Sequence, residues 1–319
     1  MIHKQLRLRG LIIRTFLRPR NEKSFIRTNA LLRRYLNWKY PLDLVVRECA
    51  IPREDGRQIR AIVCAPIQNI GQATGVLWLH GGGYAIGTPE QEFPYAQEIL
   101  GIANAVIVIP DYRLSLDAPF PAALEDAYAA LLWLKDNADS LGVNINQLFV
   151  AGQSAGGGLT AAVTALARDR GEVAVAFQMP LYPMLDDRMN TPSATNNNAP
   201  AWDSHSNRIC WQMYLGDLFG TDKVPPYAAP ARLSDFSNLP PTYTFVGDIE
   251  PFRDETVNYI KALRDAGVSA KVDVFEGCYH AFDIIGADKE IGKEATRRWV
   301  EEFKYAVGNH YAENQPRAI

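Results

Sequence analysis

The chain has 319 residues, of which 47% are hydrophobic and 22% are charged. This composition is typical of a globular protein with a large core, and it excludes a disordered, collagen-like or disulfide-scaffold chain. The net charge of −3 is unevenly divided along the chain. Residues 1–40 carry eleven Lys and Arg and one acid, a net charge of +10, which leaves −13 for the remainder.

The four cysteines show neither a CxxC spacing nor paired metal ligands, so we expect free thiols, no metal and no disulfide framework. No apolar run is long enough to span a bilayer. The apolar stretch at residues 11–13 is interrupted by Arg14 and lacks a small-residue cleavage site, which argues against a secretory signal. We therefore expect a cytoplasmic protein.

In chain order, residues 1–40 are predicted to be helical, with apolar positions at helical spacing and a break near Pro19. These positions are Leu6, Ile13, Leu17, Phe25, Leu31, Leu32, Tyr35 and Leu36. Strands are predicted at residues 44–46, 59–65, 76–79, 105–109, 148–150, 173–179, 243–246 and 271–275. Helices are predicted at residues 121–134, 154–168, 251–266 and 291–306. This alternation predicts an α/β fold with a mostly parallel central sheet flanked by helices.

One segment breaks the alternation. Residues 185–230 are rich in Asn, Asp and Pro, and only residues 209–215 show a helical pattern. An irregular stretch of this length inside a domain is usually functional.

The sequence Gly152-Gln-Ser154-Ala-Gly156 lies between a predicted strand and a predicted helix. Such a turn exposes a serine hydroxyl at the edge of a sheet, and its glycines prevent collisions with neighbouring backbone. His80-Gly-Gly-Gly83 ends an earlier predicted strand, and glycine loops of this kind offer backbone N–H groups to an oxyanion. These two motifs predict a serine nucleophile.

Of the five histidines, His280 follows the last predicted strand, where a serine hydrolase of this type carries its general base. His80 is expected to brace the glycine loop. For the acid, the segment after residues 243–246 offers four carboxyl groups. Asp254 and Glu255 fall in or near the first turn of a helix, which leaves Asp248 and Glu250 as candidates.

These motifs together resemble the hormone-sensitive-lipase-like esterases of the α/β-hydrolase fold, over residues 76–282. The resemblance includes Asp111-Tyr-Arg-Leu114, Pro119-Phe-Pro-Ala-Ala-Leu-Glu-Asp126, Glu250-Pro-Phe-Arg-Asp-Glu255 and His280-Ala-Phe-Asp283. Two positions depart from the family pattern, because Gln153 and Glu250 stand where the family usually has Asp.

The resemblance implies Ser154 as nucleophile, His280 as base and Glu250 as acid, with Asp248 as second choice. It implies an oxyanion hole made by the N–H groups of Gly82, Gly83 and Ala155. It also implies a helical cap made of residues 1–40 and the insertion 185–230, over a catalytic core of residues 41–184 and 231–319. The residues expected to face the substrate pocket are Tyr84, Trp202, Trp211 and Tyr214.

We therefore predict a serine carboxylesterase for short- to medium-chain esters that works through an acyl-enzyme, with no metal or cofactor. The alternatives are a lipase or amidase of the same class and a non-catalytic small-molecule receptor on the same scaffold. The expected partner is a small ester, not a nucleic acid, and a homodimer is left open. The basic first forty residues also raise contact with a membrane surface, although solvated arginines packing on an acidic core are the preferred explanation.

Overall fold

A computed structural model describes residues 1–16, 19–35, 40–68 and 70–312. Its centre is an eight-stranded sheet with the strand order β1-β2-β4-β3-β5-β6-β7-β8. β1 and β2 pair antiparallel, as do β2 and β4, and the neighbouring pairs from β4 to β8 are parallel. The strands are β1 Leu44–Pro52, β2 Gln58–Pro66, β3 Ala73–Leu79, β4 Ala105–Pro110, β5 Val143–Gln153, β6 Phe177–Leu181, β7 Thr242–Gly247 and β8 Ala270–Phe275.

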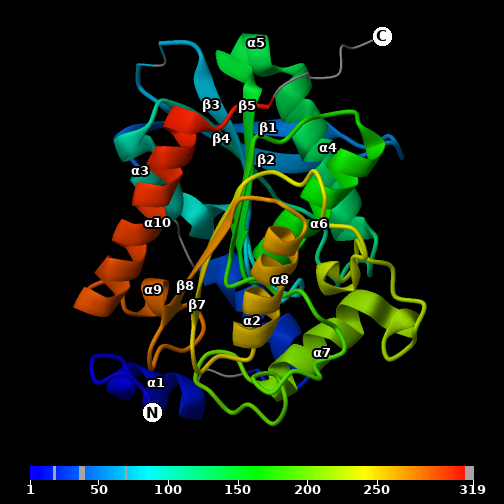
Figure 1. Cartoon of the computed structure of the whole chain (residues 1–319), viewed down its shortest axis with the longest axis vertical. Coiled ribbons are helices and arrows are strands. Elements are labelled where there is room, and N and C mark those ends of the chain that lie inside the picture. Colours follow the sequence, from blue (N-terminus) through cyan, green and yellow to red (C-terminus); the bar gives the residue numbers. More distant parts are fainter. Residues whose placement is uncertain (17–18, 36–39, 69, 313–319) are drawn as a thin grey trace.

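Helices cover both faces of the sheet (Figure 1). Along β3, Leu77 and Leu79 pack into the core on the side of α4 and α6, whereas Val76 and Trp78 pack on the side of α3 and α10. This alternation follows from the two-residue period of a strand, and it explains why the buried strands are apolar throughout. The helices of the core are α3 Phe93–Ile102, α4 Ala122–Asp136, α5 Ala138–Leu141, α6 Ala155–Arg170, α8 Arg253–Asp265, α9 Phe282–Ile285 and α10 Glu290–Asn309.

The remaining helices lie at the end of the sheet where β5 ends and α6 begins (Figure 1). They are α1 Arg7–Phe16, α2 Glu22–Tyr35 and α7 Ser204–Leu215, and the short 3₁₀ turns are η1 Pro89–Glu92, η2 Gly216–Leu218 and η3 Pro230–Arg232. The helical prediction for the N-terminal segment agrees with α1 and α2, while its positions Leu17 and Leu36 lie outside the described residues. Within the described part of the chain, no helix is both long and apolar enough to cross a membrane.

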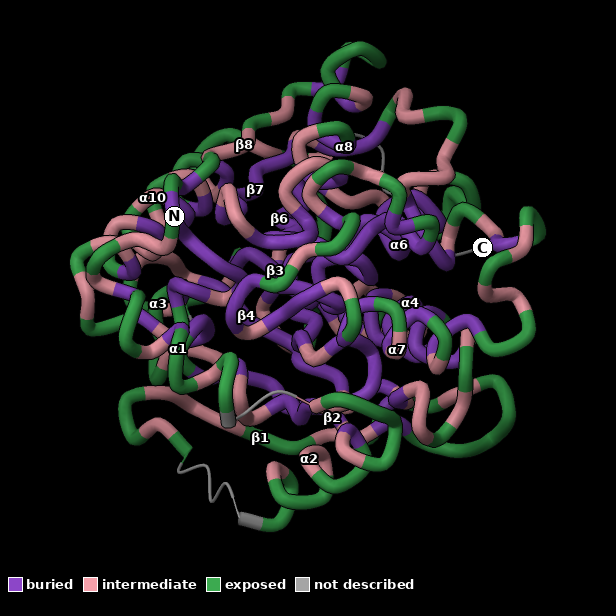
Figure 2. Tube along the Cα trace, turned by 90° about the horizontal axis from the view of Figure 1, so that it is seen from below, coloured by how far each residue is buried: buried purple, intermediate pink, exposed green. Residues whose placement is uncertain are grey.

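Arginines of the basic N-terminal segment pair with acids from the rest of the chain. Arg9 donates to Asp288 with an Nη2–Oδ2 distance of 2.9 Å, Arg20 lies 3.5 Å from Asp203, and Arg33 lies 2.7 Å from Asp111. The uneven charge of the sequence therefore corresponds to ion pairs that attract the N-terminal helices to the acidic remainder of the chain. In the view of Figure 2, α1 and α2 lie at the surface of the molecule, and Leu8, Leu11 and Leu31 are exposed.

Several predicted boundaries were wrong. β6 begins at Phe177 and not at Val173, because the apolar residues 173–176 are buried or half-buried but are not part of the strand. α8 begins at Arg253, two residues after Pro251. α7 begins five residues earlier than its predicted pattern, because the Asp203 side chain accepts the N–H of Ser206 at 2.8 Å and caps the helix. Helix α3 was not predicted.

Candidate active site

Ser154 occupies a strained turn between β5 and α6. Its φ of 59° and ψ of −120° lie outside the regions that a serine prefers. A Cβ at Gly152 would lie 2.4 Å from the carbonyl oxygen of Leu79, and one at Gly156 would lie 2.0 Å from the same oxygen. Both glycines are therefore required for the turn to approach β3, and the turn directs the Ser154 hydroxyl toward His280.

His280 lies in the loop between β8 and α9, with Nε2 2.8 Å from Ser154 Oγ. The side chain is buried, and three aromatic rings lie around it. The ring centroids of Tyr182 and Phe252 are 5.0 Å from that of His280, and the Trp202 centroid is 6.1 Å away. This packing restricts rotation of the imidazole and keeps Nε2 on the serine.

Glu250 is fully buried and hydrogen-bonds His280 Nδ1 through Oε2. Its other oxygen accepts the N–H of Gly247 at 2.9 Å. Asp248, the second candidate acid, instead accepts the N–H of Gly277 at 2.6 Å. The structure thus brings Ser154, His280 and Glu250 into one hydrogen-bonded chain that does not include Asp248.

The two other acids of this segment hold the 185–230 insertion in place. Glu255 is buried and accepts the N–H of Leu185 at 2.7 Å, and Asp254 accepts the N–H of Ser193 at 2.7 Å. Burial raises the pKa of the Glu255 carboxyl well above its usual value. Beyond their position in the first turn of α8, these acids connect the insertion to the element that follows Glu250.

The glycine loop passes directly beside Ser154, since a Cβ at Gly81 would lie 3.3 Å from Ser154 Cβ. Gly82 has a φ of 122°, and a Cβ there would lie 1.9 Å from the carbonyl oxygen of Ile86. Gly83 has a φ of 62°, and a Cβ there would meet the Trp202 ring at 2.5 Å. Ala155 is the first residue of α6, so its N–H has no acceptor within the helix. The expected oxyanion donors therefore flank the serine.

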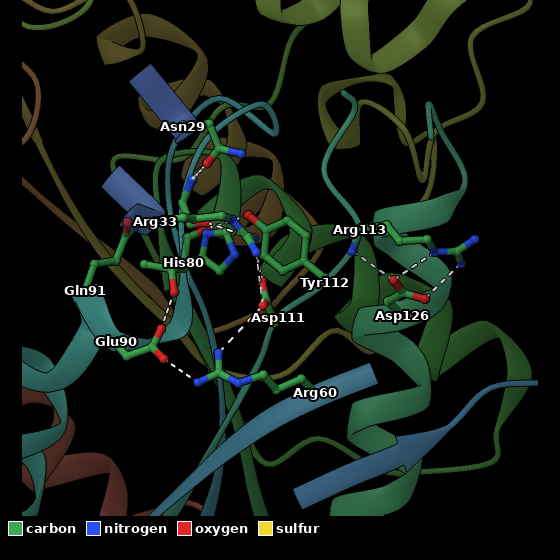
Figure 3. Close-up of polar contacts among 12 residues, drawn as sticks. Asn29, Arg33, Arg60, His80, Glu90, Gln91, Asp111, Tyr112, Arg113 and Asp126 are labelled. Carbon is green, nitrogen blue, oxygen red and sulfur yellow. Dashed lines mark hydrogen bonds and ion pairs between the residues drawn. The ribbon is translucent and has the colours of Figure 1, made fainter. Parts of the chain in front are cut away.

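His80 braces this loop (Figure 3). Its ring stacks on Tyr112 with a centroid distance of 4.1 Å, and the Tyr112 hydroxyl donates to the His80 carbonyl at 2.7 Å. His80 Nδ1 lies 2.9 Å from the Gly81 carbonyl oxygen, which can only accept, so the proton resides on Nδ1. Burial lowers the pKa of His80 to about 4, which keeps the ring neutral at pH 7.

Helix α2 contacts the same loop through polar side chains. Asn29 Oδ1 accepts the N–H of Gly87 at 3.2 Å, and Arg33 donates to the Gly87 carbonyl at 3.1 Å. Figure 3 shows Arg33 of α2 and Arg60 of β2 converging on Asp111. The basic N-terminal helix is therefore joined to the loop that carries the expected oxyanion donors.

The four predicted pocket residues divide into two groups. Trp202 lies beside His280 and packs edge-on against Phe25 of α2, with a centroid distance of 6.2 Å. Tyr84, Trp211 and Tyr214 pack against one another instead, and the Tyr84 and Tyr214 rings stack at 3.8 Å. All three are buried, and their place in the substrate pocket stays a prediction.

The sequence analysis missed Glu92, a fully buried carboxyl group that contacts Gln153, the neighbour of the serine. Nothing at residues 91–92 distinguishes this acid from a surface acid. The unusual Gln153 was the available signal, since a changed residue beside a nucleophile suggests a changed partner.

Comparisons with known proteins place this geometry in a family. Residues 76–284 match the family model described as the alpha/beta hydrolase fold. Carboxylesterase NlhH of Mycobacterium tuberculosis is 33% identical over 235 residues, which are 73% of this chain and 73% of that protein. The chain belongs to the hormone-sensitive-lipase-like esterases of the α/β-hydrolase fold. It is a carboxylic ester hydrolase.

Other members of this esterase family are similar over most of the chain. The ethyl acetate hydrolase of Pseudomonas putida is 27% identical over 81% of this chain and 82% of that protein. The structure of a bacterial heroin esterase superimposes with a TM-score of 0.88 at 31% identity, covering 96% of this chain and 98% of that chain. The resemblance to the family inferred from the motifs is confirmed, as is the mostly parallel sheet flanked by helices.

Proposed function

We propose that this esterase hydrolyses short- to medium-chain carboxylic esters through an acyl-enzyme on Ser154. The observation that carries the proposal is the hydrogen-bonded chain from Ser154 Oγ to His280 and on to Glu250. A serine hydroxyl is a weak nucleophile alone, and an adjacent imidazole that takes its proton makes it reactive.

In the proposed mechanism, Ser154 Oγ attacks the ester carbonyl carbon while His280 Nε2 takes its proton. Glu250 holds the Nδ1–H tautomer and stabilises the imidazolium. The N–H groups of Gly82, Gly83 and Ala155 stabilise the tetrahedral oxyanion. His280 then protonates the leaving alcohol, and the acyl group remains on Ser154. A water molecule deprotonated by His280 releases the acid and restores the hydroxyl.

The preference for shorter acyl chains is supported by the bulky side chains around the serine. A Cβ at Gly83 would lie 2.5 Å from the Trp202 ring and 2.7 Å from Cys210 Sγ, so little room separates the oxyanion loop from the insertion. Phe25 of α2 packs behind Trp202. The name of the related ethyl acetate hydrolase is consistent with this preference.

Residues 1–40 and 185–230 would form the cap of this pocket, over a core of residues 41–184 and 231–319. α2 and the segment around Trp202 contribute side chains that meet near His280, which supports this division. The cytoplasmic location, the oligomeric state and any contact with a membrane surface stay predictions.

Initial rates on p-nitrophenyl esters of increasing acyl length test the proposal. We expect kcat/KM to peak for acyl chains of about two to six carbons and to fall at least about tenfold for long chains, since each methylene that the pocket rejects loses binding energy. Ser154→Ala should abolish the activity on every ester. A maximum on long-chain esters would favour the lipase alternative, and preferred cleavage of anilides would favour the amidase. Because the chain is an ester hydrolase by its family, the receptor alternative is set aside.

A further inference from the structure

Glu92 is a buried carboxyl group between the two loops of the candidate active site. It ends the η1 turn and has 0% exposure. Its Oε1 accepts hydrogen bonds from the side-chain amides of Gln153 and Gln91, both at 2.9 Å. Its Oε2 accepts from Trp78 Nε1 at 2.7 Å. Three neutral donors thus converge on one carboxyl.

No Lys or Arg pairs with Glu92 among the described residues. Burial raises the pKa of this carboxyl to about 7, the three hydrogen bonds oppose the rise, and the charge of Asp283 adds to it. The hydroxyls of Tyr112 and Tyr182 also lie close enough for the charge of Glu92 to raise their pKa values. Burying an unpaired carboxyl costs stability that an apolar side chain would not cost. This stability cost suggests that the carboxyl of Glu92 has a function, which its contacts identify.

Its partners belong to the two halves of the site. Gln153 is the residue before Ser154 at the strained turn. Gln91 donates both to Glu92 and to the Gly81 carbonyl, at 3.3 Å, beside the expected oxyanion donors. Trp78 is in β3, two residues before His80. One carboxyl group thus connects the serine turn to the glycine loop.

We propose that Glu92 is a positioning residue, which acts through Gln153 and Gln91 to fix the glycine loop relative to the Ser154 hydroxyl. The inference rests on the proposed function, in which Ser154 attacks and the loop stabilises the oxyanion. A displacement of about 1 Å between such groups costs roughly 10²-fold in rate. Glu92 touches no reacting atom.

The same contact explains Gln153, where the sequence departs from the family pattern. A carboxyl at position 92 needs a donor at position 153, and a glutamine amide supplies one. An acid at position 153 would put two carboxyl groups in contact inside the protein, where both cannot readily be ionised.

An exchange of the two side chains tests the coupling. Glu92→Gln replaces a carboxyl that accepts from three donors by an amide with one acceptor oxygen, so at least one N–H then faces an N–H. Gln153→Glu creates the carboxyl pair without changing side-chain length. The double variant Glu92→Gln/Gln153→Glu restores one donor facing one carboxyl, with the direction of the hydrogen bond reversed. Because Gln91 and Gln153 share one oxygen of Glu92, the Gln91 amide then faces the new N–H, and the recovery is partial.

We expect each single variant to lose about 10- to 100-fold in kcat with KM changed less than about threefold, because only the transition-state geometry suffers. The loss in Gln153→Glu should increase with pH relative to the parent enzyme, since ionisation makes the carboxyl pair repulsive. The kcat of the double variant should be at least about tenfold higher than that of the less active single variant.

Gln147→Glu is the matched control. Gln147 lies on β5 at the end away from Ser154, is buried, accepts from Thr74 Oγ1 at 2.9 Å and donates to the Val307 carbonyl at 2.6 Å. The same substitution there should lower Tm, but leave kcat within about twofold because it touches neither loop.

Two results would overturn the inference while Ser154→Ala remains inactive. One is kcat per folded molecule unchanged in the single variants although Tm falls, which would make Glu92 merely structural. The other is a double variant whose kcat is no higher than that of the less active single variant. Activity retained by Ser154→Ala would overturn the proposed function, and this inference with it.

Discussion

The replacement of Glu250 by Gln separates the role of its charge from that of its shape. The carboxylate uses both oxygens in a fully buried place, one for His280 Nδ1–H and one for Gly247 N–H. A glutamine amide has one acceptor oxygen and one NH₂ group, so it can satisfy only one of these donors.

Either orientation of the amide damages the site. If its oxygen stays on Gly247 N–H, its NH₂ group faces His280 Nδ1, and the imidazole proton moves to Nε2, where the ring can no longer accept the Ser154 proton. If its oxygen faces His280, two buried N–H groups point at each other, at a cost of about 1–3 kcal/mol. The first orientation is therefore favoured, and loss of the correct tautomer costs on the order of 10⁴-fold in kcat, about 5.5 kcal/mol.

The assay is kcat for p-nitrophenyl acetate hydrolysis, with thermal unfolding to show that Glu250→Gln is folded. Asp248→Asn is the control, because Asp248 accepts the N–H of Gly277 and, in the described structure, makes no hydrogen bond with His280. We expect Asp248→Asn to keep kcat within about tenfold, as a change of a neighbouring hydrogen bond would. A large loss in Asp248→Asn with little loss in Glu250→Gln would refute the assignment of the acid.

Three further outcomes follow from the structure. Gly82→Ala places a Cβ 1.9 Å from the Ile86 carbonyl oxygen and should cost about 10²–10³-fold in kcat. The control Gly101→Ala adds a Cβ in α3 that meets no neighbouring group within 4 Å, so it should keep kcat and stabilise the protein by about 0.5–1 kcal/mol. Equal kcat values for the two variants would contradict the role of the loop. Arg33→Met removes the 2.7 Å ion pair with Asp111 and should lower Tm by about 1–3 °C. This Tm difference should shrink at about 1 M salt, and a Tm difference that does not depend on salt would exclude the electrostatic explanation. Burial raises the pKa of Glu92 to about 7, so the unfolded chain loses this proton at lower pH than the folded protein does. The free energy of unfolding, relative to that of Glu92→Gln, should therefore fall as pH rises from about 4.5 to 7 and then level off. A difference in unfolding free energy that does not vary with pH would contradict this.

The sequence predicted the strands correctly where a short apolar run is followed directly by residues that favour a turn. β3, β4 and β7 were recognised because they are short apolar runs that end at turn residues. β6 was placed four residues early because residues 173–176 are apolar but precede the strand, a difference that hydropathy cannot detect. α3 was missed because Pro94 and Gly101 interrupt its helical pattern, although Pro94 stands in the first turn, where proline is tolerated.

At the candidate site, the motifs predicted which residue types lie near Ser154, but not how the surrounding side chains share hydrogen bonds. Asp248 and Glu250 could not be separated by spacing alone, since the choice depends on the turn between β7 and α8 and on the approach of the His280 loop. For the aromatic residues the sequence could not show that Tyr84, Trp211 and Tyr214 pack with one another, and their contact with a substrate stays a prediction. Glu92 reaches the serine turn only through tertiary packing.

The central claim is that Ser154 is the nucleophile that His280 activates, and covalent labelling tests it most directly. Enzyme treated with a p-nitrophenyl alkylphosphonate should gain the mass of one phosphonyl group, and peptide mapping should locate it on Ser154. Ser154→Ala should gain none, and His280→Ala should react far more slowly, because the base is lost. An adduct on another residue, or full labelling and ester hydrolysis by Ser154→Ala, would contradict the account.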